Sequence, residues 1–412
     1  MRLQTALVPL YVVAKVCCLN AFTYLPLQLD VLRAKRFSDG VQRTGRMLAF
    51  STVGVLHAIG CCLAYATYHV VSSLGQSSKL TDSNLVRVAI DLKNQYIGCI
   101  LVLGLVAAFL FRQPSFDALF RTLVRVDKAL PVMVQVSGQQ ADGSTLINNA
   151  AWLRNVLLML VFGVGVKAVL EVSNCLMYIR DSGSPFSSNC LLLCIVPQTL
   201  CVVSEVQFVA YTMLIGDRLQ LINRWLVRLQ PSLACGNANT HASLRHVVRI
   251  HRELTNAIRL LDRCFGLQNV ILVLYQFVTL VELGYNICMM IVRYAEAEVQ
   301  QGDSTEDLLE TAYWVVWFVL EIFVLCYFSH ATIAEAEETA HLLAFPTSYD
   351  WSHRGAFHVV SQEQLVFVNR RTCLTGGGGL FPVDLTLLHA IIGATTTYLI
   401  ILIQFDQSFN GN

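Results

Sequence analysis

The sequence predicts an all-α polytopic membrane protein with seven transmembrane helices. Hydrophobic residues make up 55% of the 412-residue chain and charged residues only 14%, whereas about 25% of the residues in a soluble globular domain are charged. Seven apolar segments reach the length of about 20 helical residues that crossing a bilayer requires. The net charge of +1 gives no indication of a nucleic-acid partner.

Residues 1–45 are predicted to form a cytoplasmic N-terminal segment. The stretch Ala6 to Ala14 is apolar and follows Arg2, as in a secretory signal peptide, but Pro9 interrupts it and no small-residue cleavage site follows. We therefore expect the segment to be retained, and to pack on the body of the protein or lie at the membrane interface.

The membrane-spanning part comprises six predicted helices within residues 46–331 and a seventh at 381–405. Lys93 interrupts the second helix and Lys167 the third. A charged side chain inside the bilayer normally faces a partner or a cavity. The seven predicted spans are 46–72, 89–112, 151–178, 190–215, 264–292, 309–331 and 381–405.

Basic residues are concentrated in alternate connections, which orients the chain. Lys and Arg number seven in residues 1–46, five in 112–154, eight in 218–263 and three in 354–371. The connection 296–310 instead carries six Asp and Glu residues and neither Lys nor Arg. Because basic connections stay in the cytoplasm, we expect a cytoplasmic N-terminus and, after seven crossings, an extracellular C-terminus.

Other classes of membrane protein fit less well. A G-protein-coupled receptor has the opposite orientation, no Asp-Arg-Tyr closes the third span, and no Asn-Pro-x-x-Tyr closes the seventh. The pair Asp217-Arg218 after the fourth span is only a two-residue match. A transporter or membrane enzyme is a further alternative, but neither HExxH nor a nucleophile elbow is found. We therefore expect no enzymatic activity.

The 14 cysteines mostly lie inside apolar spans, where they are typical of small buried hydrophobic residues. No CxxC pair or Cys/His spacing suits zinc, so we predict no metal site and no cofactor. A disulfide between Cys190 and a neighbour at the outer face remains open.

The last span carries polar groups on one narrow face. Gly393, Thr397, Ile400 and Gln404 follow one another in steps of four, three and four residues, so they overlie on a helix. An unpaired amide in lipid is costly, and Gln404 should therefore meet protein, water or the interface. The span alone leaves two interpretations open: hydrogen bonds between helices, or the lining of a pore.

The same span resembles a family signature. Thr397-Tyr398, five apolar residues and Gln404-Phe405 are similar to the TYhhhhhQF motif at the C-terminus of insect gustatory receptors. The preceding residues 371–394 also resemble that family, whose last helix follows a turn containing Gly and Phe.

This resemblance implies a homo- or heterotetramer in the plasma membrane of a chemosensory neuron. Each subunit would contribute its last helix to one central pore, through which monovalent and divalent cations pass. A small-molecule tastant would open the pore, and membrane lipids would surround the assembly. The residues implied at the pore or its gate are Thr397, Ile400, Ile401, Gln404 and Phe405.

Residues 332–380 would then form a cytoplasmic anchor. His330 to Phe345 is predicted to continue the sixth span as an acidic helix, and Ser361 to Arg371 to form an amphipathic helix; solvated loops are the alternative. Gly376 to Gly379 is predicted to be a flexible hinge before the last helix. Residues 406–412 would be a short extracellular tail.

Polar and aromatic residues repeat at helical spacing in the outer halves of four spans, which predicts a ligand pocket open to the outside. The alternative is structural: an i,i+4 pair of Lys167 and Glu171, and tryptophans that anchor the interface. The predicted pocket residues are Asn94, Gln95, Lys167, Glu171, Asn174, Tyr178, Thr279, Glu282, Asn286, Tyr313, Trp314 and Trp317.

The residue after the Thr-Tyr pair bears on the ligand. Family members that detect sugars tend to carry an acidic residue there, whereas this chain has Leu399. The resemblance therefore implies a tastant-gated, non-selective cation channel for bitter compounds, with a fructose-type sugar receptor as the alternative.

Overall fold

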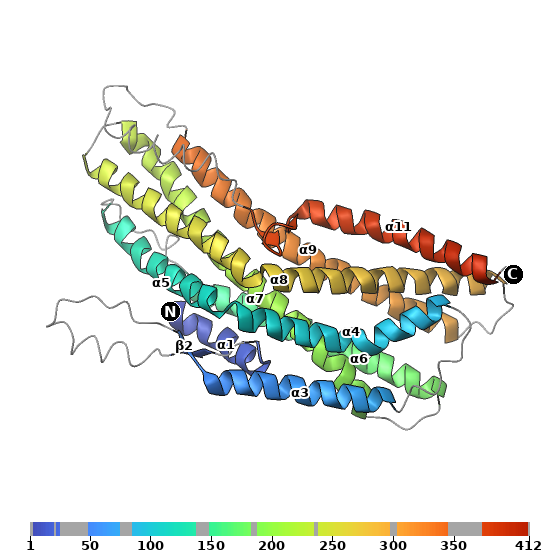
Figure 1. Ribbon diagram of the computed structural model, residues 1–412. Coiled ribbons are helices and arrows are strands. Elements are labelled where there is room, and N and C mark those ends of the chain that lie inside the picture. Colours follow the sequence, from blue (N-terminus) through green and yellow to red (C-terminus); the bar gives the residue numbers. More distant parts are fainter. Residues whose placement is uncertain are drawn as a thin grey trace.

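The computed structural model describes residues 3–19, 22–24, 48–74, 85–136, 148–182, 188–234, 238–296, 303–344 and 373–410. These residues form an elongated bundle of long helices, accompanied by two small two-stranded antiparallel sheets (Figure 1). One sheet pairs β1 (Phe22–Tyr24) with β2 (Leu48–Phe50), and the other pairs β3 (Thr375–Gly376) with β4 (Phe381–Pro382).

Each of the seven predicted spans contains a helix, but the first and the last begin later than predicted: residues 48–50 and 381–382 belong to strands. Among the described residues, six helices are long and apolar enough to cross a membrane: α3 (Thr52–Leu74), α6 (Asn149–Ser182), α7 (Ser188–Ala234), α8 (Ala238–Glu296), α9 (Asp303–Ala344) and α11 (Leu385–Asn410). The second span is covered by α4 (Leu85–Phe111). Together with α5 (Gln113–Val136) it meets the same criterion, with a 63° bend between the two. The predicted all-α membrane architecture is therefore confirmed.

The central helices extend well beyond a bilayer. Helix α8 has 59 residues, which corresponds to roughly 89 Å at 1.5 Å per residue, whereas a hydrocarbon core is about 30 Å thick. Helices α5, α7, α8 and α9 continue together past the start of α11 (Figure 1). The predicted continuation of the sixth span is confirmed as far as Ala344. The amphipathic helix predicted at 361–371 lies outside the described residues.

The N-terminal helix α1 (Leu3–Val16) packs on the body of the protein, one of the two locations expected for this segment. It contacts α5, α6 and α7. Its apolar side chains Leu3, Leu7 and Leu10 are each at most 3% exposed. Burial of this face attaches the segment to the bundle through the hydrophobic effect.

The glycine run 376–379 is a tight turn bound to α8 rather than a free hinge. Thr375 donates hydrogen bonds from its amide (2.7 Å) and its hydroxyl (2.8 Å) to Asp262. The amide of Gly377 donates to the carbonyl of Gly266 at 2.7 Å. Gly377, Gly378 and Gly379 have φ values of 65°, 77° and 117°, a left-handed conformation that glycine adopts readily.

Candidate functional site

A buried ion pair joins two of the membrane helices. The ammonium of Lys167 on α6 lies 2.9 Å from Oε1 of Glu321 on α9. It also donates to the side-chain oxygen of Gln198 on α7 at 2.9 Å. Lys167 is only 2% exposed, so its charge depends on these partners rather than on water.

Further hydrogen bonds extend this pair into a network across four helices. The amide of Gln276 on α8 donates to Glu205 on α7 at 2.6 Å and to Glu321 at 3.3 Å. The amide of Gln198 donates to the hydroxyl of Tyr275 at 2.7 Å. The indole of Trp317 donates to Glu321 at 2.9 Å. We call these seven residues the polar cluster: Lys167, Gln198, Glu205, Tyr275, Gln276, Trp317 and Glu321.

The polar cluster carries more acidic than basic groups. Glu205 and Glu321 are 8% and 9% exposed and share the amide of Gln276, while Lys167 is the cation of the cluster. Its ammonium also lies 5.1 Å from the centre of the Phe318 ring, which adds a favourable cation–π contact. A proton or an additional cation would balance the remaining carboxylate.

The predicted pocket residues fall into several groups. Lys167 and Trp317 belong to the polar cluster, and Glu171 and Trp314 are buried on the same two helices. The structural alternative predicted that Lys167 pairs with Glu171. In the structure Lys167 forms its ion pair with Glu321 instead. Glu282 instead pairs with Lys93 and links α8 to α4.

The remaining predicted pocket residues are more dispersed. Thr279 and Asn286 are half-buried on α8. Tyr313 is 63% exposed, on the surface of α9. The backbones of Asn94 and Gln95 lie in α4 and those of Asn174 and Tyr178 in α6, but their side chains are outside the described part.

The predicted pocket contains two of the seven cluster members, Lys167 and Trp317. Tyr275 and Glu321 continue the same polar stripes on their helices, whereas sequence reasoning missed Gln198, Glu205 and Gln276 altogether. Each is a polar side chain inside a predicted span and at most 8% exposed. An ionisable or amide group at such a position is itself an indication of a site. These three residues lie outside the four-three-four repeats of polar residues that predicted the pocket.

A shallow groove of about 370 Å³ runs along the outer surface of α6. Apolar side chains line it together with Arg154, and it contains none of the predicted pocket residues.

The polar face of α11 points away from its own chain. Leu387, Ile391 and Asp406 are buried, at 8%, 6% and 4% exposure, and mark the side that packs on the bundle. The five predicted pore residues are all exposed: Thr397, Ile400, Ile401, Gln404 and Phe405.

Neither polar residue of this face forms a hydrogen bond with another of the described helices. The hydroxyl of Thr397 donates to the carbonyl of Gly393, one turn earlier in α11, at 3.0 Å. Gln404 forms no side-chain hydrogen bond with any residue that the structure describes. Among the described residues, Thr397 and Gln404 therefore form no hydrogen bond from α11 to another helix.

Aromatic and aliphatic contacts attach α11 to α8. Tyr398 meets Phe277 edge to face, with ring centres 5.8 Å apart. Leu399 approaches Gly284, where a β-carbon would lie 3.7 Å from the leucine methyl groups. Phe277 directly follows Tyr275 and Gln276 in sequence, so α8 connects the polar cluster with the last helix.

Comparison with known proteins decides the family. The chain matches the 7tm chemosensory receptor family over residues 7–409. It belongs to that family. A 49-residue segment is 51% identical to gustatory receptor 2a of Drosophila melanogaster, and this match covers 12% of the chain and 11% of that receptor.

Among solved structures, the chain is similar to the insect olfactory receptor OR5 from Machilis hrabei in complex with eugenol. The TM-score is 0.49 and the sequence identity 11%, over 98% of both chains. As a 7tm chemosensory receptor, the protein is a multi-pass membrane protein and not an enzyme. The resemblance predicted from the C-terminal motif is thereby confirmed.

Proposed function

We propose that this chemosensory receptor is a subunit of a tastant-gated, non-selective cation channel whose pore is lined by α11. The observation that carries the proposal is the direction of the polar face of α11. Gln404 is exposed on the side facing away from the bundle, and an amide left in hydrocarbon would be costly. Another subunit or water must therefore meet it.

Comparison with α3 supports a pore-lining role for the exposed face of α11 rather than contact with lipid. Both helices are poorly covered by the rest of the chain. The large hydrophobic side chains exposed on α3 include Val53, Leu56 and Leu63, as expected for a face in contact with lipid. The exposed face of α11 also carries large apolar side chains, among them Ile400 and Phe405, but combines them with Thr397 and Gln404. Polar groups next to an apolar constriction suit a water-filled path.

Four subunits arranged around a central axis would bring four such faces together. Gln404 and Phe405 would form the narrowest part at the outer end, and Thr397, Ile400 and Ile401 would line the path below them. Both monovalent and divalent cations would pass, because a ring of amides carries no fixed charge. The amide oxygens would replace part of the hydration shell of each ion and so set the relative permeabilities.

The ligand would bind among α4, α6, α8 and α9, next to the polar cluster, where Trp314 and Trp317 supply aromatic surface. Bitter compounds are the proposed class, because Leu399 replaces the acidic residue found in sugar-detecting members; a fructose-type receptor is the second candidate. Gating requires that the ligand binds the open state more tightly than the closed state. Helix α8 offers the connection, from Gln276 in the polar cluster to Phe277 beneath Tyr398.

The test is to express the chain alone in a cell line and record whole-cell currents. The probes are denatonium, quinine, caffeine, fructose and sucrose, with surface delivery checked by biotinylation. We expect a rapid cation current with at least one bitter probe, and no loss of that current when the pipette contains a non-hydrolysable GDP analogue. A response abolished by the GDP analogue would favour a G-protein-coupled receptor. The absence of current with all probes, despite surface delivery, would contradict a channel formed by this chain alone.

A further inference from the structure

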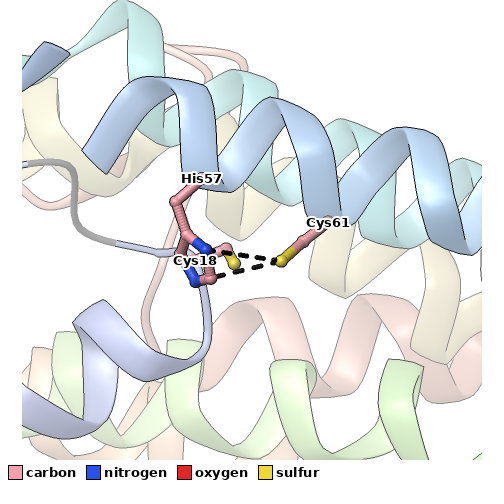
Figure 2. Close-up of side chains that lie close together, drawn as sticks. All are labelled: Cys18, His57 and Cys61. Carbon is pink, nitrogen blue, oxygen red and sulfur yellow. Dashed lines mark hydrogen bonds between the residues drawn. The ribbon is translucent and has the colours of Figure 1, made fainter. Parts of the chain in front are cut away.

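Two cysteines and a histidine from separate parts of the chain meet beside α3. His57 and Cys61 lie one turn apart on α3, and Cys18 lies in the turn that follows α1. Figure 2 shows the thiols of Cys18 and Cys61 converging on the imidazole of His57. One ligand atom from each residue can be chosen so that all three lie within 4.8 Å of one another. No role in the proposed pore or pocket involves them.

The spacing of these atoms suits metal coordination. The sulfur of Cys61 is 3.8 Å from both ring nitrogens of His57. Metal–sulfur and metal–nitrogen bonds of about 2.3 and 2.0 Å place tetrahedral ligand atoms roughly 3.4 to 3.8 Å apart. Because the sulfur is equally far from both nitrogens, the imidazole would have to turn so that one ring nitrogen faces the thiols. That rotation and a small contraction of the cluster would bring all three atoms onto one ion.

The backbone conformation at Cys18 is unusual for a residue other than glycine. Cys18 has a φ of 60°, and the amide of Leu19 bonds to the carbonyl of Ala14 at 2.8 Å, which closes the end of α1. Glycine or asparagine is preferred at such a left-handed cap, because other residues are strained there. A cysteine at this position places its side chain toward α3 at a local cost in backbone energy.

The location favours a metal over a disulfide. His57 is five residues into α3, roughly 8 Å from its first residue, and this end of the helix is predicted to lie at the cytoplasmic face. Disulfides are rare in that reducing compartment, whereas thiolates there commonly bind metal ions.

We propose that Cys18, His57 and Cys61 form a binding site for a thiophilic d¹⁰ cation, Zn²⁺ or Cu⁺, which joins the N-terminal segment to α3. Two thiolates and one imidazole leave one tetrahedral position of Zn²⁺ open to water, or complete a three-coordinate site for Cu⁺. Two thiol protons are released when the ion binds. The ion would secure α3, which packs mainly against α4.

The test uses the purified full-length receptor and a variant at each ligand. Wild type, Cys18→Ser, His57→Ala and Cys61→Ser are equilibrated with Zn²⁺ or, under reducing conditions, with Cu⁺, and bound metal is measured by mass spectrometry. Cys373→Ser serves as the matched control, since Cys373 is an exposed cysteine remote in sequence from the site. Size-exclusion chromatography verifies that each variant is folded.

We expect wild type and Cys373→Ser to retain an ion that each ligand variant binds at least about tenfold more weakly. X-ray absorption should show two sulfur ligands and one nitrogen ligand around the bound ion. Comparing the amounts of Zn²⁺ and Cu⁺ that are retained shows which of the two ions the site prefers. Equal binding by wild type and the three ligand variants, or no binding by folded wild type, would overturn the proposal. So would a Cys18–Cys61 disulfide in protein isolated under alkylating conditions. None of these outcomes depends on channel activity.

Discussion

Lys167 on α6 and Glu321 on α9 form an ion pair of 2.9 Å between two buried side chains. Their helices meet at the polar cluster, where Gln276 also connects Glu321 with Glu205 on α7. Removing one partner from a buried pair costs more than removing both, because a lone charge is left without water. This asymmetry makes the pair open to a direct test.

Lys167→Met should destabilise the receptor by about 3–5 kcal/mol, because it leaves Glu321 and Glu205 without their ammonium. Lys167→Met combined with Glu321→Gln should recover part of that loss. Thermal unfolding of the purified variants in detergent measures both effects. Lys128→Met, a change of a lysine in α5, is the control and should behave like wild type. A Lys167→Met receptor as stable as wild type would show that the pair contributes little.

Gly266→Ala should loosen the turn that precedes α11. Its new β-carbon would lie 3.3 Å from the amide nitrogen of Gly377, a backbone atom with little freedom to move. Losing the hydrogen bond between these residues costs roughly 1 kcal/mol. The amides of residues 375–380 should then exchange hydrogen several times faster, as measured by mass spectrometry.

The control for that substitution is Gly165→Ala on α6, where a β-carbon would meet no atom within 4 Å. It should leave exchange in the turn unchanged. Equal exchange rates in Gly266→Ala and wild type would mean that the turn is held mainly by Asp262.

An epitope after Asn412 should be stained on intact cells, because seven crossings from a cytoplasmic N-terminus place the C-terminus outside. An epitope inserted at residues 235–237, between α7 and α8 and within the basic segment 218–263, should be stained only after permeabilisation. The reverse pattern would rule out the predicted orientation. It would also rule out a cytoplasmic location for the proposed metal site at Cys18, His57 and Cys61.

The membrane helices could be predicted from sequence because apolar length is a local property of the chain. Lys93 interrupts the apolar stretch of the second span, and α4 reaches the criterion for a span only together with α5. The docked turn at Gly376 could not be predicted, since it depends on Asp262 and Gly266 far along the chain.

The partners that side chains find on other helices could not be predicted from local sequence patterns. Spacing offered Glu171 as the neighbour of Lys167, but the fold supplies Glu321. In the same way, no linear motif connects Cys18 with His57 and Cys61. The sequence therefore predicted no zinc site, because the proximity of these three residues arises only in the fold. Helical periodicity identified the face of α11 that contains Thr397 and Gln404, while its outward direction required the packing of Leu387 and Ile391.

The most direct test of the account is the ion permeability of Gln404→Ala. Reversal potentials of the tastant-evoked current, measured with sodium outside and potassium or calcium substituted in turn, report the relative permeabilities. Gln407→Ala, an exposed amide on the flank of the same helix, is the matched control. We predict that Gln404→Ala shifts the reversal potentials while the set of active compounds stays the same, and that Gln407→Ala shifts neither. Permeabilities of Gln404→Ala identical to wild type would contradict a pore lined by this face of α11.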